Sequence, residues 1–562
     1  MTRYIRWQIL LILLGVVLVG ILLTYLAINY TTVDRPGHGG TYVEGMAGFP
    51  RHLNPLLSGY NDVDRDLCSL VFSGLTRLNE RGEVEADLAR GWEVTPDGLS
   101  YTFYLRSNAY WHNGAPLTAD DVIFTISLLQ DPDFPGPPDL GANVWHMVEV
   151  EKVDRRTVRF TLPEPYAPFL DYTTVGILPA HILGETRSVD LPDVAFNLNP
   201  VGSGPFQVEE IEIESGTITT MVLKQFSRYY GARPYLDRVQ FRFYPNRQMV
   251  LNAYEAEEVE GVAQIVIEDL PRARAYPTLN LFSAQIAEYS LVFLNLNRSS
   301  VPFLQEPEVR QALLYGLDRQ RIINEALMGQ AVIAHSPLIP GTWAYNNDTP
   351  RYEYDPDKAN ELLDRTDWLM PVEGDGVRRQ AGRQMALTLL TSNKPERIHV
   401  AQMMAEQWAA IGVTTTVEIA SPLEVRDALE SRDFEAVLVH LPLPGDPDPY
   451  PFWHETQVES GQNYSGLEHR RISEVIEQAR VIVNPGSRER RQELYYEFQE
   501  LFAQEVPALL LYVPVYTYGV DERIHDVQIG PLMYPFDRFR TIHEWWMVYR
   551  RVFVSETELG RP

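Results

Sequence analysis

Cysteine is nearly absent from this chain. Cys68 is the single cysteine among 562 residues, which excludes an internal disulfide and a zinc site built from cysteines. It lies in the apolar stretch from Leu67 to Leu75. We therefore expect a small buried side chain at this position rather than a reactive thiol.

Positive charge is also scarce. The chain has 48 basic residues against 76 acidic ones, and its formal net charge is -28. Binding to the phosphates of nucleic acids requires a basic surface, so this balance argues against a nucleic-acid partner. The acidity does not identify a ligand, because an acidic surface often serves only solubility.

Recognisable catalytic and metal-binding motifs are missing from the chain. The patterns H-E-x-x-H, G-x-S-x-G and G-x-x-x-x-G-K-[ST] do not occur. Ser203 stands between two glycines but is followed by Gly204-Pro205, which predicts a tight turn rather than a nucleophile. The 12 histidines show no metal-ligand spacing, and His440 and His454 lie nearest to a candidate site. We therefore expect no enzyme, no metal site and no cofactor; a secreted hydrolase would need a nucleophile–base pair that the sequence does not offer.

The N-terminal segment is strongly hydrophobic. The apolar run from Ile9 to Ile28 is long enough to cross a bilayer core of ~30 Å as a helix. Arginines precede it, which favours a cytoplasmic N-terminus and an external chain. Ala27 has Tyr25 two positions before it, a poor match to a signal-peptidase site. We expect residues 1–30 to be an uncleaved membrane anchor, with a cleaved signal as the alternative.

The remaining chain alternates strand-like and helix-like patterns, which is typical of mixed α/β layers. The clearest predicted strands are Thr157–Leu162, Val239–Tyr244 and Leu291–Asn297. The clearest predicted helices are Glu308–Met328, Asp355–Leu363, His399–Ile411 and Arg488–Phe502. The segments Asp131–Gly141 and Leu441–Pro451 are rich in proline, which fixes φ and removes hydrogen-bond donors, so both are predicted loops.

The stretch from Pro96 to Asp121 is the most informative. Its alternating residues predict a strand, and the turn Asn113-Gly114 leads to Thr118, which can cap a helix with Asp121 in its first turn. This order resembles the signature of extracytoplasmic solute-binding proteins of peptide/nickel-type ABC importers, solute-binding family 5. Further stretches resemble elements of that family in the family's order: Leu53–Pro55, Val71–Leu75, Asp87–Trp92, Pro200–Phe206, Tyr229–Gly231, Pro234–Asp237, Val309–Ala312, Gly316–Arg319 and Tyr354–Leu363.

The resemblance implies an architecture. The expected fold is α/β and two-lobed, like type II periplasmic binding proteins, with an extra inserted domain and an N-terminal transmembrane helix. The expected division is an anchor or signal at 1–30, a tether at 31–40, lobe I at 41–78, 199–295 and 511–550, an inserted domain at 79–198, lobe II at 296–510 and a tail at 551–562. Hinge strands are expected near Phe293–Asn297 and Leu509–Val513.

The resemblance also places a ligand between the lobes. Asp446 and Asp448 lie beside aromatic residues in the segment Pro444–Trp453, and a carboxylate near this loop pairs with the ammonium of a bound peptide in the family. The chain departs from the family here, because Gly445 stands where the family has an aspartate; Asp446 substitutes for it after a shift of one residue, or both acids only terminate turns. The other ligand candidates are Tyr60, Asn61, Asp62, Trp145, Gln264, Trp343, Tyr345, Asn463 and Tyr464. Core packing or a surface role is the alternative for each, and Trp111 and His112 are expected to be structural.

These inferences predict an extracytoplasmic binding protein of an ABC importer. It would be a monomer, anchored in the cell membrane on the periplasmic or cell-surface side, that captures peptides between its lobes and delivers them to separate permease subunits. The same fold binding an oligosaccharide, an opine or a metal chelate is one alternative. A surface sensor is another.

Overall fold

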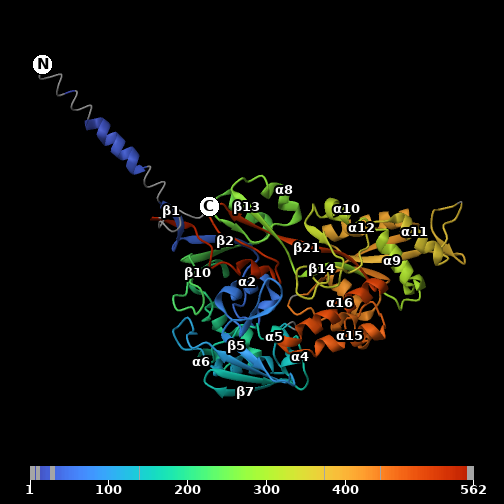
Figure 1. The fold of residues 1–562 in the computed structure, drawn as a ribbon, viewed down its shortest axis with the longest axis horizontal. Coiled ribbons are helices and arrows are strands. Elements are labelled where there is room, and N and C mark those ends of the chain that lie inside the picture. Colours follow the sequence, from blue (N-terminus) through green and yellow to red (C-terminus); the bar gives the residue numbers. More distant parts are fainter. Residues whose placement is uncertain are drawn as a thin grey trace.

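The structure is a computed structural model, and it describes residue 7 and residues 13–25, 32–137, 140–372, 374–443 and 445–553. Within the described residues one mixed sheet of 12 strands runs through both lobes (Figure 1). Its main path has the order β19-β18-β20-β14-β21-β12-β2-β11-β10-β9, and β13 and β15 also pair with β21. The two-lobed α/β fold expected from the sequence is therefore confirmed.

Each lobe takes its strands from distant parts of the chain. The first-lobe strands are β2 (Thr41–Ala47), β9 (Phe206–Glu214), β10 (Thr217–Gln225), β11 (Arg238–Tyr244), β12 (Gly261–Val262) and β13 (Leu279–Gln285). The second-lobe strands are β14 (Glu288–Leu294), β15 (Ala331–Ile333), β18 (Ala386–Ser392), β19 (Thr414–Ala420) and β20 (Ala436–Pro442). β21 (Ala508–Asp521) belongs to both lobes.

The long strand β21 carries the chain from one lobe to the other. Its residues up to Tyr512 pair with β14, and its residues from Val515 onward pair with β13. Pro514 and Val515 are half-buried, while the remaining residues of the strand are buried in one lobe or the other. The second crossing is the short link between β13 and β14, where the N–H of Ile286 donates to the carbonyl of Pro514 at 3.3 Å.

A four-stranded antiparallel layer packs below the first lobe (Figure 1). It has the order β5-β6-β8-β7, with β5 at Ala89–Val94, β6 at Ser100–Leu105, β7 at Glu149–Asp154 and β8 at Thr157–Thr161. α3 (Ala119–Leu129) covers it and begins as the sequence predicts, because the N–H of Thr118 donates to Asp121 Oδ2 at 2.8 Å. The layer and most of the first lobe share one hydrophobic core, a smaller first-lobe cluster lies around Val250 and Leu270, and the second lobe has its own core.

Helices cover the sheet of each lobe. In the first lobe and the four-stranded layer they are α2 (Asp62–Val71), α4 (Ala142–Trp145), α5 (Phe169–Tyr172), α6 (Ala180–Leu183), α7 (Arg247–Glu255) and α8 (Leu270–Ala273). In the second lobe they are α9 (Pro307–Tyr315), α10 (Arg319–Ala326), α11 (Pro356–Arg365), α12 (Pro395–Ala410), α13 (Pro422–Ser431), α14 (Tyr450–Trp453), α15 (Arg470–Arg480) and α16 (Arg488–Glu505). Short pairs of strands complete the fold: β1 (Thr32–Gly37) with β22 (Val548–Phe553), β3 (Thr76–Leu78) with β4 (Val84–Ala86), and β16 (Arg379–Gln380) with β17 (Arg383–Gln384).

Three predicted elements differ from the structure. The helix predicted over His399–Ile411 begins four residues earlier, at Pro395. The helix predicted over Glu308–Met328 is two helices, because Asp318 accepts a hydrogen bond from the N–H of Arg321 and starts α10 as a new helix. Strand β14 lies three residues before the predicted Leu291–Asn297, because its register with β20 starts at Glu288.

The hydrophobic N-terminal run is described only in part. Residues 13–25 form a helix with exposed apolar side chains, and residues 8–12 and 26–31 lie outside the described residues. In the described part of the chain, no helix combines the length and hydrophobicity that a membrane crossing requires.

Candidate ligand-binding site

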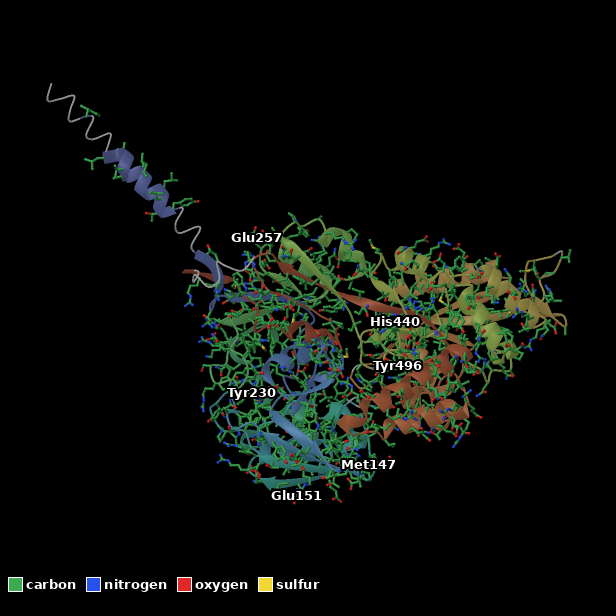
Figure 2. All side chains as sticks on the ribbon, viewed as in Figure 1. Met147, Glu151, Tyr230, Glu257, His440 and Tyr496 are labelled. Atoms are coloured by element: carbon green, nitrogen blue, oxygen red, sulfur yellow. The ribbon has the colours of Figure 1, made fainter. Side chains whose placement is uncertain are left out.

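A cavity of about 710 Å³ lies where the two lobes and the four-stranded layer meet. The first lobe contributes Tyr230, labelled in Figure 2, and the segment around Phe536. Tyr166, Asp171 and Tyr172 come from the segment that follows the four-stranded layer in sequence. The second lobe contributes the loop after β20, with Gly445, Asp446, Asp448 and Pro451. The volume falls within the range of ~300–1,000 Å³ that small-molecule sites occupy.

The acidic loop of the second lobe is held by arginines. Asp446 receives two bonds from Arg491 on α16, with Nη1–Oδ2 at 2.5 Å and Nη2–Oδ1 at 2.6 Å. Arg480 Nε on α15 lies 3.0 Å from Asp448 Oδ2. Burial raises the pKa of Asp448, and the Arg480 charge opposes that shift. The bidentate Arg491–Asp446 pair fixes both partners in place, so the loop is already organised.

Asp171 on the short helix α5 faces this loop from the other side of the cavity. Its Oδ2 accepts a hydrogen bond from the backbone N–H of Asp446. Burial, followed by the nearby negative charge of Asp446, raises the pKa of the Asp171 carboxyl well above its usual range. Tyr166 and Tyr172 stand beside it with their hydroxyl oxygens 3.4 Å apart.

A second polar group lines the first-lobe side of the cavity. Tyr230 donates its hydroxyl to Asp87 Oδ1 at 2.5 Å, and the Arg106 guanidinium lies 5.4 Å from the Tyr230 ring centroid. Burial raises the pKa of Asp87 to about 6. The cavity therefore offers aromatic surface together with charged groups of both signs.

Direct contacts join the second lobe to the segment of residues 79–198 beside the cavity. Arg488 on α16 pairs with Glu83 in the turn between β3 and β4, with Nη2–Oε1 at 2.5 Å. Arg480 contacts the Tyr166 ring at 4.9 Å, and the N–H of Ala167 donates to the Arg480 carbonyl at 2.8 Å. In this structure the second lobe therefore touches the segment of residues 79–198 across the site.

Two of the residues predicted from sequence, Asp446 and Asp448, line the cavity. Trp343 and Trp145 support it from behind. The Trp343 ring centroid lies 5.6 Å from that of Tyr495 and 5.3 Å from the Arg491 guanidinium carbon. Trp343 therefore packs against Arg491, the arginine that binds Asp446. Trp145 is fully buried and lies 5.6 Å from Phe169 of α5, the helix that carries Asp171.

The predicted residues Tyr60, Asn61 and Asp62 lie around the start of α2. Tyr60 is exposed, and its hydroxyl donates to the Pro135 carbonyl at 3.2 Å. Asn61 caps α2 by accepting from the N–H of Val63 at 3.1 Å. Asp62 is exposed. None of these three side chains lines the cavity within the described residues.

The remaining predicted residues lie outside the cavity lining. Gln264 is exposed and accepts a bond from Arg247 Nη2 at 2.7 Å. Tyr345 is half-buried against the second-lobe core. Tyr464 packs 5.4 Å from Phe293, with Arg432 over its ring.

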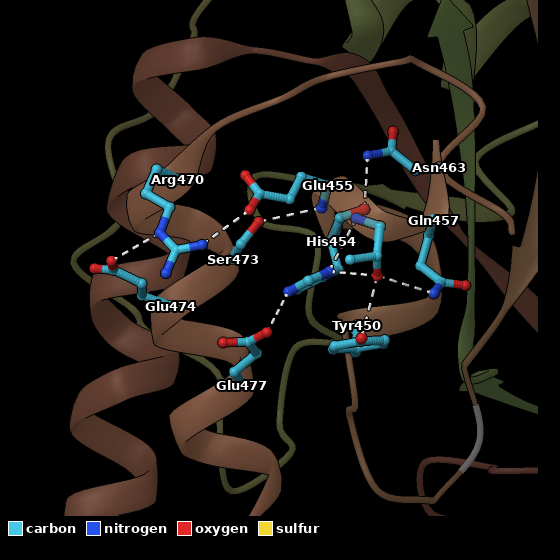
Figure 3. A network of polar contacts seen from close by, with 10 residues as sticks. Tyr450, His454, Glu455, Gln457, Asn463, Arg470, Ser473, Glu474 and Glu477 are labelled. Carbon is cyan, nitrogen blue, oxygen red and sulfur yellow. Dashed lines mark hydrogen bonds and ion pairs between the residues drawn. The ribbon is translucent and has the colours of Figure 1, made fainter. Parts of the chain in front are cut away.

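Asn463 is fully buried and belongs to a polar network beside α15 (Figure 3). Its Nδ2 donates to the carbonyls of His454 at 3.2 Å and Leu467 at 2.9 Å. The network continues from His454 Nε2 to Glu477 Oε1 at 2.9 Å. Asn463 thus shapes the chain that follows the acidic loop.

Sequence reasoning missed Asp171, Tyr166 and Tyr172. A signal was present, because the segment from Glu164 to Tyr172 mixes proline, aromatic residues and an acid, as the segment from Gly445 to Trp453 does. The structure brings these two segments together. Among the described residues, no group of three or more His, Cys, Asp or Glu side chains is placed to hold a metal ion.

Comparison with known proteins assigns the family. The model of the bacterial extracellular solute-binding proteins, family 5 (middle part), matches residues 83–464, which is more than half of the chain. The chain belongs to this family. The sequence resemblance found through the motifs is therefore confirmed.

Relatives of this solute-binding protein match over most of their length. The oligopeptide-binding protein AppA of Bacillus subtilis is 28% identical over 524 residues, 92% of this chain and 93% of that protein. The structure of AppA with a nonapeptide has a TM-score of 0.68 and covers 92% of this chain and 100% of that one at 27% identity. The dipeptide-binding protein of Escherichia coli is 27% identical over 88% of this chain and 92% of that protein. NikZ of Campylobacter jejuni, solved with Ni(L-His), shares the fold with a TM-score of 0.70 at 23% identity, over 90% of this chain and 99% of that one.

Proposed function

We propose that this solute-binding protein captures peptides in the cavity between its lobes and delivers them to the permease of an ABC importer. One observation carries the proposal: groups from both lobes and from the segment that follows the four-stranded layer line one cavity of about 710 Å³. Such a site is completed only when the lobes approach each other, so a ligand that contacts both of them favours the closed form. The names of the oligopeptide- and dipeptide-binding relatives support a peptide as the ligand.

The setting of the protein is part of the same proposal. The N-terminal run is proposed to anchor the chain in the cell membrane, with the lobes outside the cytoplasm as a monomer. The proposed division keeps the inserted domain at 79–198. The pairing of β14 and β21 supports crossings at Ile286–Ala287 and Pro514–Val515, in place of the hinge strands predicted near Phe293–Asn297 and Leu509–Val513. Asp446 and Asp448 have the strongest support among the predicted ligand residues, because they line the cavity.

Thermal unfolding with defined ligands tests the proposal. A ligand that binds only the folded state adds ~2.7 kcal/mol at a hundredfold excess over its Kd, so a binding peptide raises the melting temperature of the purified ectodomain. We expect pools of di- and tripeptides to raise it, and oligosaccharides, opines and a nickel–histidine chelate to leave it unchanged. Mass spectrometry of co-purifying molecules gives an independent readout. A shift with one of the other classes and none with peptides would refute the peptide assignment.

A further inference from the structure

Asp171 is a carboxylate of the cavity that forms no ion pair with any described residue. Among the described residues, no Lys, Arg or His nitrogen lies within the 4.0 Å of an ion pair with it, although Asp446 and Asp448 each have one. Its Oδ2 accepts the N–H of Asp446, and no described donor contacts Oδ1. Asp171 lines the cavity, so its carboxylate is available to a ligand.

The charges around Asp171 do not balance. Asp171, Asp446 and Asp448 meet at one end of the cavity, and the pKa of Asp171 responds to both other acids and to Arg491. Arg491 and Arg480 supply the two positive charges, and each is bound to a different aspartate of the loop. The ionised cluster therefore has one more negative charge than positive charges, in a site where burial makes an uncompensated charge costly.

The absence of a side chain at Gly445 makes room for the Asp171 carboxylate beside the loop. Gly445 has a φ of 76°, and a side chain at this position would overlap Asp171 Oδ2. The carboxylate of Asp171 thus occupies the space beside the loop that a side chain of residue 445 would fill. It reaches this space from the opposite side of the cavity, so contact with it depends on the approach of the two lobes.

We propose that Asp171 binds the ammonium group of the ligand, and that the cavity thereby selects ligands with a free amino group. The inference deepens the proposed function and rests on it. An ammonium in contact with Oδ1 restores the charge balance of the cluster and supplies hydrogen-bond donors to an oxygen that lacks them. Burial raises the pKa of the free carboxyl, and a bound ammonium would reverse this shift.

The test compares Asp171→Asn with the wild type against a pool of tripeptides and the same pool after N-acetylation. Asparagine keeps the shape and the acceptor for the Asp446 N–H but removes the charge. Because truncating one partner of a buried charge pair costs at least ~2 kcal/mol, we expect the variant to bind the free-amine pool about 30-fold more weakly. Binding of the acetylated pool should be the same for both proteins. Asp193→Asn, an exposed aspartate outside the cavity, is the matched control and should bind both pools as the wild type does.

Moving the carboxylate from residue 171 to residue 445 distinguishes recognition of the ligand's ammonium group from structural support of the loop. Asp171→Ala should lose the preference for free amines, and Asp171→Ala/Gly445→Asp should regain about tenfold of the lost affinity, because aspartate tolerates a positive φ and its side chain would enter the vacated space. Equal binding of the free-amine pool by Asp171→Asn and wild type would overturn the inference while leaving peptide capture intact. An equal loss for both pools would also overturn it. Failure of the wild type to bind either pool would instead refute the proposed function.

Discussion

At the residue scale, His112 links two turns that are far apart in sequence. The N–H of Gly202 donates to its Nδ1 at 3.1 Å, so Nε2 carries the proton and donates to the Gly204 carbonyl at 3.1 Å. Burial lowers the pKa of His112 from 6.5 to about 4. This hydrogen-bonding role agrees with the structural assignment made from sequence, because the ring is used as a neutral connector.

The lowered pKa of His112 predicts acid sensitivity. The unfolded chain takes up a proton near pH 6.5 and the folded protein only near pH 4. The contribution to stability is therefore complete above pH 6.5 and falls as the pH drops towards 4, by up to about 3 kcal/mol. In urea titrations at several pH values, His112→Asn should be less stable at neutral pH and show a shallower loss across this window. The exposed His146→Asn serves as the control, and an unchanged slope in His112→Asn would contradict the assignment.

The residues of the site differ in how readily the sequence reveals them. Asp446 and Asp448 are visible because two acids stand among prolines and aromatic residues in a predicted loop. Asp171 stands in a similar segment of proline and aromatic residues, but its partner in the structure, Asp446, is 275 positions away and the local pattern does not encode that contact. Tyr60 and Gln264 were predicted from family position alone, and the structure places both on the surface. Local chemistry can be read from sequence, whereas pairing across the cavity depends on the tertiary fold.

At the element scale, a buried charge network joins β2, α2 and the short helix η9 (Pro535–Phe539). Arg538 Nη2 lies 2.7 Å from both Glu44 Oε1 and Asp66 Oδ2, and Tyr518 donates to Glu44 Oε2 at 2.6 Å. The Arg538 and Glu44 side chains are completely buried. Because η9 also contributes Phe536 to the cavity wall, the network holds one wall of the ligand site in place.

Removal of the central cation should destabilise the first lobe strongly. Arg538→Met would leave Glu44 and Asp66 buried without a counter-charge, and breaking a buried pair in this way costs about 3–5 kcal/mol of unfolding free energy. Urea denaturation monitored by circular dichroism measures the loss. Arg81→Met, at an exposed arginine, should change stability by less than about 0.5 kcal/mol. A loss below about 1 kcal/mol in Arg538→Met would show that the network does not carry the element packing assigned to it.

The ends of helices and strands could be predicted from sequence only where local contacts define them. The start of α3 follows from Thr118 and Asp121, whose contact is only three residues long and needs no tertiary context. The break between α9 and α10 was missed, because the apolar spacing continues through it and only the cap at Asp318 marks the new start. The shift of β14 was also missed, since pairing with β20 decides its register. Local signals define where many elements begin, and long-range pairing decides how far they extend.

At the scale of the whole molecule, the two crossings of the sheet and the contacts across the cavity act together. The lobes are joined through β21 and the link at Ile286–Ala287, and the second lobe also contacts the segment of residues 79–198 through Arg488 and Glu83. Rotation about the crossings would separate that ion pair while leaving each hydrophobic core intact, as in hinge motions of binding proteins. The Arg488–Glu83 pair should therefore stabilise the closed form and slow the release of ligand.

Charge reversal tests this role of the ion pair. Both side chains are partly exposed, so the pair contributes at most about 1 kcal/mol and its reversal should speed ligand release by about 3- to 10-fold. Stopped-flow measurement of peptide dissociation should show this for Glu83→Lys, and Glu83→Lys/Arg488→Glu should return to within about twofold of the wild type. The difference should shrink at high salt, because screening weakens exposed charges. Glu149→Lys reverses an exposed charge away from the cavity and should leave release unchanged; an equal acceleration in that variant would attribute the effect to net charge rather than to lobe closure.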